Sequence, residues 1–157
     1  MKRSSVQLIE KNDLFNGLGM NVLILTTRNA ARSQMIEGWL RYYLKGKADV
    51  CSAGLEQSVL DPFAVKAMME AVIDIRGQKA KVLNDLESLK FDSVFALTGK
   101  AFEKANELFP EANVEMVEIA DPSLGGGDDM ERLKVYRKTV DEVDNFAFSI
   151  RARFIQS

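Results

Sequence analysis

Hydrophobic residues alternate between two kinds of pattern from about residue 20 onward. Val22–Leu25 is a continuous apolar run, which is typical of a parallel strand covered on both faces. From Arg32 to Leu44, apolar residues recur at steps of one, three and four, which predicts an amphipathic helix. The same patterns predict three further strands, at Asp49–Cys51, Val94–Leu97 and Val114–Ile119.

The remaining helices are predicted from periodicity and from end signals. Asp61-Pro62 predicts the start of a second helix, since Asp suits the cap and Pro the first helical position. Asp128 or Asp129 caps the last helix in the same way. Helical segments are predicted at Asn84–Leu89, Lys100–Leu108 and Met130–Phe154. Strands and helices that alternate in this order predict an α/β fold around a parallel sheet.

Two parts of the chain differ in pattern. Residues 1–19 carry scattered apolar side chains and end in the helix-breaking Asn16–Gly19, so we predict an N-terminal extension. Residues 20–157 form the single predicted domain. The extension is expected to be weakly ordered, to dock on the domain, or to join two copies of the chain as a homo-oligomer, and the sequence leaves these three open.

Composition narrows the classes of function. With 21 Lys and Arg against 23 Asp and Glu, the net charge is −2, so we expect no nucleic-acid partner. No apolar stretch is long enough to span or enter a membrane, and no leader is visible. A single Cys forbids an internal disulfide, which suits the cytoplasm, our predicted location.

The chain contains no His, which excludes His-dependent catalysis and His-ligated zinc within it. The acidic and glycine-rich segment Gly125–Asp129 lacks the dispersed oxygen ligands of a calcium loop. We therefore expect neither a metal nor another cofactor.

Candidate chemistry lies after the first predicted strand, where ligands bind in open α/β sheets. This segment carries two arginines and no acid, and it precedes a helix whose first amides are free to bind an anion. The predicted oxyanion-binding residues are Thr26, Thr27, Arg28, Asn29, Ala30, Ala31, Arg32 and Ser33.

Several motifs support one resemblance; they are Arg32-Ser33-Gln34-Met35, Glu37-Gly38-Trp39-Leu40, Ser52-Ala53-Gly54 and Asp121-Pro122. Through them the chain resembles the superfamily of low-molecular-weight protein tyrosine phosphatases and thioredoxin-coupled arsenate reductases. The resemblance implies a three-layer sandwich of the phosphotyrosine protein phosphatase I-like type. Its four-stranded parallel sheet has the order 2-1-3-4.

The resemblance also implies a site whose reacting atom is missing. The family signature is Cys, five residues and Arg, and here it falls on Thr26 to Arg32, so Thr26 replaces the nucleophile. A Thr hydroxyl gains no comparable ionisation from a helix end, so covalent catalysis is expected to be negligible. Asp121 matches the family's general acid. The single Cys cannot supply the thiol relay of arsenate reduction.

Other residues of the segment keep two interpretations. Asn29, through a left-handed backbone, and Ser33, through a hydrogen bond toward the nucleophile position, either shape the binding loop or are now architectural. Arg28 either reinforces anion binding or fills the pocket. Arg32 either clamps an oxyanion or braces the loop. Cys51, on a predicted strand, is interpreted as an inert buried thiol.

The leading hypothesis is a catalytically degenerate member of this superfamily, which binds a phosphate- or arsenate-like anion or a phosphorylated ligand in a binding or regulatory role. One alternative is a phosphatase or related hydrolase that uses direct attack by water, with Asp121 as acid or base. The other is a purely structural interaction module.

Overall fold

The computed structural model describes Phe15 and residues 19–155, and a four-stranded sheet lies at its centre. The strands are β1 (Asn21–Arg28), β2 (Asp49–Glu56), β3 (Ser93–Ala96) and β4 (Asn113–Met116). Their order is β2-β1-β3-β4, and every neighbouring pair is parallel. The predicted sheet and its order are confirmed.

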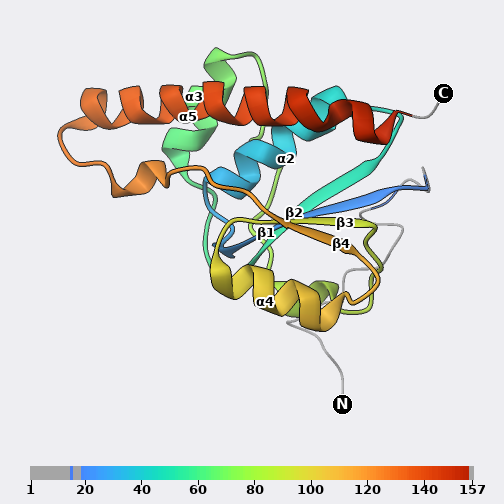
Figure 1. The fold of residues 1–157 in the computed structure, drawn as a ribbon. Coiled ribbons are helices and arrows are strands. Elements are labelled where there is room, and N and C mark those ends of the chain that lie inside the picture. The colour runs from blue at the N-terminus through green and yellow to red at the C-terminus, as the bar shows by residue number, and fades with distance from the viewer. Residues whose placement is uncertain (1–14, 16–18, 156–157) are drawn as a thin grey trace.

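Helices cover both faces of the sheet and complete the three predicted layers (Figure 1). On one face lie α2 (Arg32–Tyr43), α3 (Pro62–Glu70) and α5 (Asp129–Ile150). On the other face lies α4 (Gly99–Leu108). The described residues also form three short 3₁₀ helices: η1 (Leu83–Leu86) before β3, η2 (Pro122–Leu124) between β4 and α5, and η3 (Arg151–Phe154) after α5.

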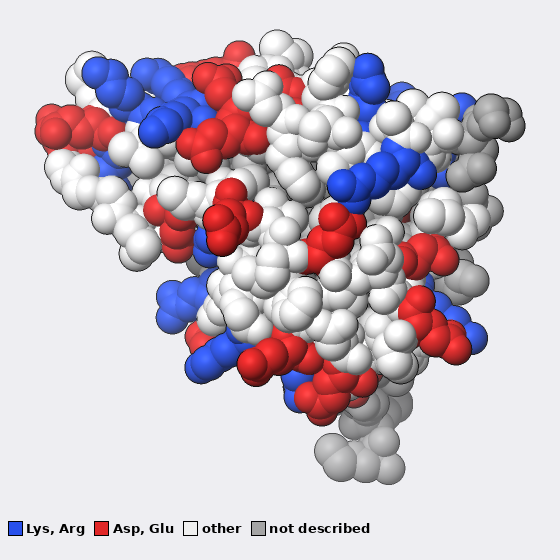
Figure 2. All heavy atoms as spheres, in the orientation of Figure 1, with Lys and Arg blue, Asp and Glu red and all other residues white. Residues whose placement is uncertain are grey.

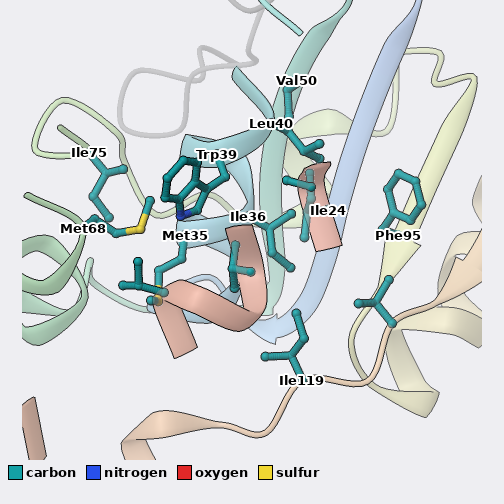
Figure 3. Close-up of a cluster of buried hydrophobic side chains, with 14 of the residues drawn as sticks. Ile24, Met35, Ile36, Trp39, Leu40, Val50, Met68, Ile75, Phe95 and Ile119 are labelled. Atoms are coloured by element: carbon teal, nitrogen blue, oxygen red, sulfur yellow. The ribbon is translucent and has the colours of Figure 1, made fainter. Parts of the chain in front are cut away.

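The apolar run of β1 supplies side chains to both faces, because successive side chains of a strand point in opposite directions. Val22 and Ile24 belong to the cluster under α2, α3 and α5, and Leu23 and Leu25 belong to the cluster beside α4. Figure 3 shows Ile24 among the side chains of the first cluster. A strand buried on both faces cannot alternate apolar and polar residues, which explains the continuous run.

The ends of several predicted elements differ from the observed ones. The predicted strand Val114–Ile119 stops at Met116. The long predicted helix is interrupted, since α5 ends at Ile150 and the 3₁₀ turn η3 follows. The short predicted helix Asn84–Leu89 is the 3₁₀ turn η1. Periodicity alone does not distinguish the last turns of an α-helix from a 3₁₀ turn.

Two surface properties bear on possible partners. Within residues 19–155, no helix is both long and apolar enough to cross a membrane. On the face shown in Figure 2, basic and acidic side chains lie interspersed, in keeping with the near-zero net charge. The prediction that nucleic acid is not a partner stays a prediction.

Candidate functional site

The segment predicted as a loop is shorter than expected, because β1 continues through Arg28. Only Asn29–Ala31 connect β1 to α2. β2 runs beside β1 as far as Glu56, and Gly54 makes the close approach possible. A Cβ on Gly54 would lie 2.7 Å from the amide nitrogen of Asn29. Position 54 of the Ser-Ala-Gly motif therefore has no room for a side chain, which explains the glycine.

Asn29 is the centre of a buried hydrogen-bond network. It is fully buried, and its side-chain amide donates to the Ser33 hydroxyl and to the Ser52 hydroxyl, both at 2.8 Å. Its carbonyl Oδ1 accepts from the Gln34 amide at 3.0 Å and from the backbone N–H of Lys81 at 2.9 Å. Asn29 does not adopt the left-handed backbone that we expected. It shapes the connection through its side chain instead.

A buried carboxylate supports this network from α2. Glu37 has an exposed fraction of 1%, and its Oε1 accepts from the Ser52 hydroxyl at 2.6 Å. Two cations compensate its charge: Arg41 Nε lies 2.9 Å from Oε2, and Lys81 Nζ lies 3.6 Å from Oε1. Buried charges are tolerated when they are paired and hydrogen-bonded, as here.

Arg32 and Asp121, which lie far apart in the sequence, meet at the start of α2. Arg32 donates from Nη1 to the backbone carbonyl of Ile119 at 2.8 Å. Its Nη2 lies 3.9 Å from Asp121 Oδ2. The other oxygen of Asp121 accepts from the backbone N–H and the hydroxyl of Ser123, at 2.9 and 2.7 Å. The Ile119 carbonyl thus restrains the Arg32 side chain, and Asp121 caps the 3₁₀ helix η2.

The N-terminus of α2 differs from those of the other α-helices that the structure describes. Side chains of Asp61, Thr98 and Asp128 accept hydrogen bonds at the starts of α3, α4 and α5. The cap position of α2 is Ala31, which offers no such group, and the first turn contains no acid. Neither a side-chain cap nor an acidic residue in the first turn therefore competes for the first amides of α2.

The three residues before Asn29 lie at the end of β1 rather than in the connection. Thr26 pairs in register with Gly54 and has an exposed fraction of 2%. The Thr27 hydroxyl donates to the Thr98 hydroxyl at 3.3 Å. The Arg28 side chain is 71% exposed and lies 3.6 Å from Glu56, so it points into solvent and does not fill a pocket.

Cys51 is the only cysteine of the chain, and it is fully buried on β2. Burial, with a smaller contribution from the negative charge of Glu37, raises the pKa of its thiol to about 12. The thiol therefore stays protonated at neutral pH, which makes it a poor nucleophile. The interpretation of Cys51 as an inert thiol agrees with this environment.

The start of α3 is tied to the same connection. The backbone N–H of Asp61 donates to the carbonyl of Ala30 at 2.9 Å. Asp61 caps α3 by accepting from Phe63 N–H at 2.8 Å, and it also accepts from the Tyr136 hydroxyl. Burial and this hydrogen bond raise the pKa of Tyr136. The predicted cap at Asp61 is confirmed.

Sequence reasoning missed three contributors to the site. Lys81 approaches Asn29 and Glu37 from a segment without any motif. The Ile119 carbonyl that orients Arg32 is a backbone group, which no residue pattern reveals. Thr98 lies in none of the motifs named above, but it caps α4 and contacts Thr27.

Comparisons with known proteins agree with this architecture. Residues 21–153 match the family described as low molecular weight phosphotyrosine protein phosphatase. The chain is 36% identical over 124 residues to an arsenate reductase of Bacillus subtilis, covering 79% of this chain and 89% of that protein. It is 38% identical over 124 residues to an arsenate reductase of Halalkalibacterium halodurans, covering 78% and 88%.

A comparison with a solved structure supports the same fold. An arsenate reductase in its phosphate-binding state superposes with a TM-score of 0.73 at 29% identity, covering 87% of this chain and 99% of that one. The fold and the sequence matches together define an α/β protein of the phosphatase and arsenate reductase class. The chain belongs to the low-molecular-weight phosphotyrosine protein phosphatase family.

Proposed function

We propose that this protein is a catalytically degenerate member of its family that binds a phosphate- or arsenate-like anion, free or on a phosphorylated ligand, in a binding or regulatory role. The observation that carries the proposal is the start of α2. There, the first backbone amides of α2 have no side-chain cap, and the first residue of the helix is Arg32. Helix N-termini and guanidinium groups both favour oxyanions.

The proposed binding residues are those of the segment Thr26–Ser33 named above. Arg32 is the charged contact, and its bond to the Ile119 carbonyl presets its orientation. Asn29 and Ser33 fix the backbone between β1 and α2 through their mutual hydrogen bond. The similar arsenate reductase in its phosphate-binding state supports phosphate as the probe.

The proposed lack of catalysis follows from the available nucleophiles. Thr26 stands where the family motif places Cys, and the chain has no His to act as its base. Cys51 is buried and protonated. Although the curated relatives named above are arsenate reductases, reduction through an internal disulfide needs two cysteines, and this chain has one.

The test combines binding with turnover. Phosphate at about 100 times its dissociation constant should stabilise the protein by about 2.7 kcal/mol and raise Tm by about 5–10 °C. Arg32→Ala should abolish the shift. Arg76→Ala removes an equal charge from an exposed side chain outside this segment and should keep most of the shift. Hydrolysis of p-nitrophenyl phosphate should stay at the rate of buffer alone, and clear turnover by pure protein would refute the proposal.

The alternative with direct attack by water has one observation in its favour, the proximity of Asp121 to Arg32 at 3.9 Å. It predicts turnover that Asp121→Asn and Arg32→Ala both abolish, while Thr26→Ala leaves it nearly unchanged. Against it stands the capping role of Asp121, whose Oδ1 already accepts two hydrogen bonds from Ser123.

Thr26→Cys tests whether the phosphatase geometry persists. Because the Arg28 side chain points into solvent, this single change should introduce measurable phosphatase activity if the anion site has the family arrangement. Thr26→Ser is the matched control, since it keeps a hydroxyl and should remain inactive. Phosphate binding without any gain of activity in Thr26→Cys would mean that the site binds anions in another geometry.

The extension at residues 1–19 lies mostly outside the described residues. Phe15 is described, and it is 5% exposed, with its ring 5.6 Å from that of Phe91 in the cluster beside α4. This contact is with the domain itself. Self-association through the extension stays a prediction, which a size measurement with and without residues 1–14 would test.

A further inference from the structure

Lys81 occupies an unusual position for a lysine. Its side chain is only 11% exposed, and its ammonium donates to the Lys79 carbonyl at 2.8 Å and lies 3.6 Å from Glu37 Oε1. Lysine is rarely buried unless it is paired, because removing an ammonium from water is costly. Arg41, the other partner of Glu37, is 50% exposed, so water can replace it.

The backbone of Lys81 contacts two further elements. Its N–H donates to the side-chain carbonyl of Asn29 at 2.9 Å, and its carbonyl accepts from Gly54 N–H at 2.8 Å. One residue thus joins α2, the connection after β1, and β2. The contact to Asn29 spans 52 residues of sequence, so it depends on the tertiary fold.

The Lys81 ammonium also affects Asn29 indirectly, through Glu37 and Ser52. The Ser52 hydroxyl donates a hydrogen bond to Glu37, so the Ser52 oxygen is free to accept one from the Asn29 amide. Asn29 is therefore held at both ends of its amide, by Ser52 and Ser33 on the nitrogen and by Lys81 N–H on the oxygen. A buried network of this kind fixes its members only when every group is satisfied.

We propose that Lys81 is a positioning residue of the anion site: the ammonium of its largely buried side chain neutralises Glu37, and the resulting Glu37–Ser52–Asn29 chain holds the connection before α2 in its anion-binding arrangement. Lys81 acts through Asn29 and contacts no ligand. The proposal rests on the proposed function, since it names the internal support of that site. Residues that support a binding site from behind determine how precisely its binding groups are held in position.

Four proteins test it: wild type, Lys81→Met, Glu37→Gln and the double variant. Lys81→Met leaves the Glu37 carboxylate with Arg41 but without Lys81, Glu37→Gln leaves the Lys81 ammonium without a carboxylate, and the double variant removes both charges. Inorganic phosphate affinity, measured by calorimetry well below each melting temperature, should fall about tenfold in either single variant and recover to within about threefold of wild type in the double. Arg41→Met is the matched control and should stay within about threefold.

A second readout does not depend on phosphate. In NMR spectra without phosphate, the side-chain amide signals of Asn29 should shift in Lys81→Met and return toward the wild-type positions in the double variant. If wild type binds no phosphate, the proposed function fails, and these signals still decide the role of Lys81. If Lys81→Met does not fold, Glu37→Gln against the double variant gives the same comparison.

Three results would overturn the proposal. One is wild-type phosphate affinity in both single variants, which would leave Lys81 with a purely structural role even if Tm falls. Another is a double variant that binds phosphate no better than the single variants. The third is an unchanged Asn29 amide signal in Lys81→Met.

Discussion

The two sides of the candidate site are held by different kinds of interaction. On the α2 side, Asn29, Ser33 and Glu37 are almost completely buried and hydrogen-bond to one another or through Ser52. On the Asp121 side, the carboxylate is 31% exposed and bonds mainly to Ser123, two residues away. The first side is fixed by long-range tertiary contacts and the second by a local turn.

This difference limits what the presence of these residues says about catalysis. The Asn29 network links the end of β1, β2 and α2 through buried hydrogen bonds, so its residues have a structural role that does not depend on a nucleophile. Asp121 is needed locally as the cap of η2. The presence of these residues is therefore weak support for catalysis, and anion binding has to be tested directly.

The largest expected effect is on the α2 side, in Asn29→Ala. The change leaves the partners of the Asn29 side chain, among them Ser33 and Lys81 N–H, without that hydrogen bond in a buried place. Since each such group costs about 1–3 kcal/mol, the free energy of unfolding should fall by about 3–5 kcal/mol. Urea unfolding monitored by circular dichroism measures it.

On the Asp121 side, the matched change is Ser123→Ala. It removes one hydrogen bond to an exposed carboxylate, so stability should fall by less than about 1 kcal/mol. Similar losses in the two variants would show that the two sides do not differ in the way described here.

A second prediction uses Cys51 to report how well the cluster beside α4 is shielded from water. Its thiol pKa is raised from 9.0 to about 12 in the folded protein. The folded state thus favours the protonated thiol, so this contribution to stability is complete below pH 9 and is lost as pH rises toward 12. The loss should approach about 1.4 kcal/mol per pH unit above pH 9.

Urea unfolding at pH 8, 9.5 and 10 with a reductant measures this loss. Cys51→Ala, which has no thiol to titrate, should lose less stability over the same range. The raised pKa of Tyr43, from 10.0 to about 12 under burial and its bond to Asp144, adds a similar loss only above pH 10. Equal slopes in wild type and Cys51→Ala would mean that the Cys51 site is not shielded from water.

How much the sequence predicts also differs between local and long-range features. Asp61 is predicted as a cap, and Asp128 is one of two candidates for the last helix. Both are caps, and a cap bonds to an amide only two or three residues away. The sheet order followed from the resemblance, and the strands at its centre followed from their apolar runs. These features depend on short stretches of chain or on the fold as a whole.

Contacts that join distant segments were not predictable in this way. Arg32 bonds to a carbonyl 87 residues away, and Lys81 to a side chain 52 residues away. The extent of β1 was underestimated because Thr26–Arg28 are too polar to read as strand. They are ordered there by pairing with β2 beside Gly54, which only the folded sheet supplies.

The smallest expected effect concerns the contact that joins the two sides, between Arg32 and Asp121. Because the Asp121 carboxylate competes with an anion for the Arg32 guanidinium at 3.9 Å, Asp121→Asn should strengthen phosphate binding. The pair is partly exposed, so the gain should be only about two- to threefold in affinity, measured by calorimetry. Glu111→Gln, which makes the same change of charge near the start of β4, should leave the affinity unchanged.

The direction of this effect separates the two functional interpretations. If Asp121 served as an acid or base in hydrolysis, Asp121→Asn would abolish a measurable turnover. If it only restrains Arg32, the variant gains affinity and turnover stays at background. A weaker phosphate affinity in Asp121→Asn would show instead that Asp121 helps to hold Arg32 in its binding orientation, so that the two sides act as one unit.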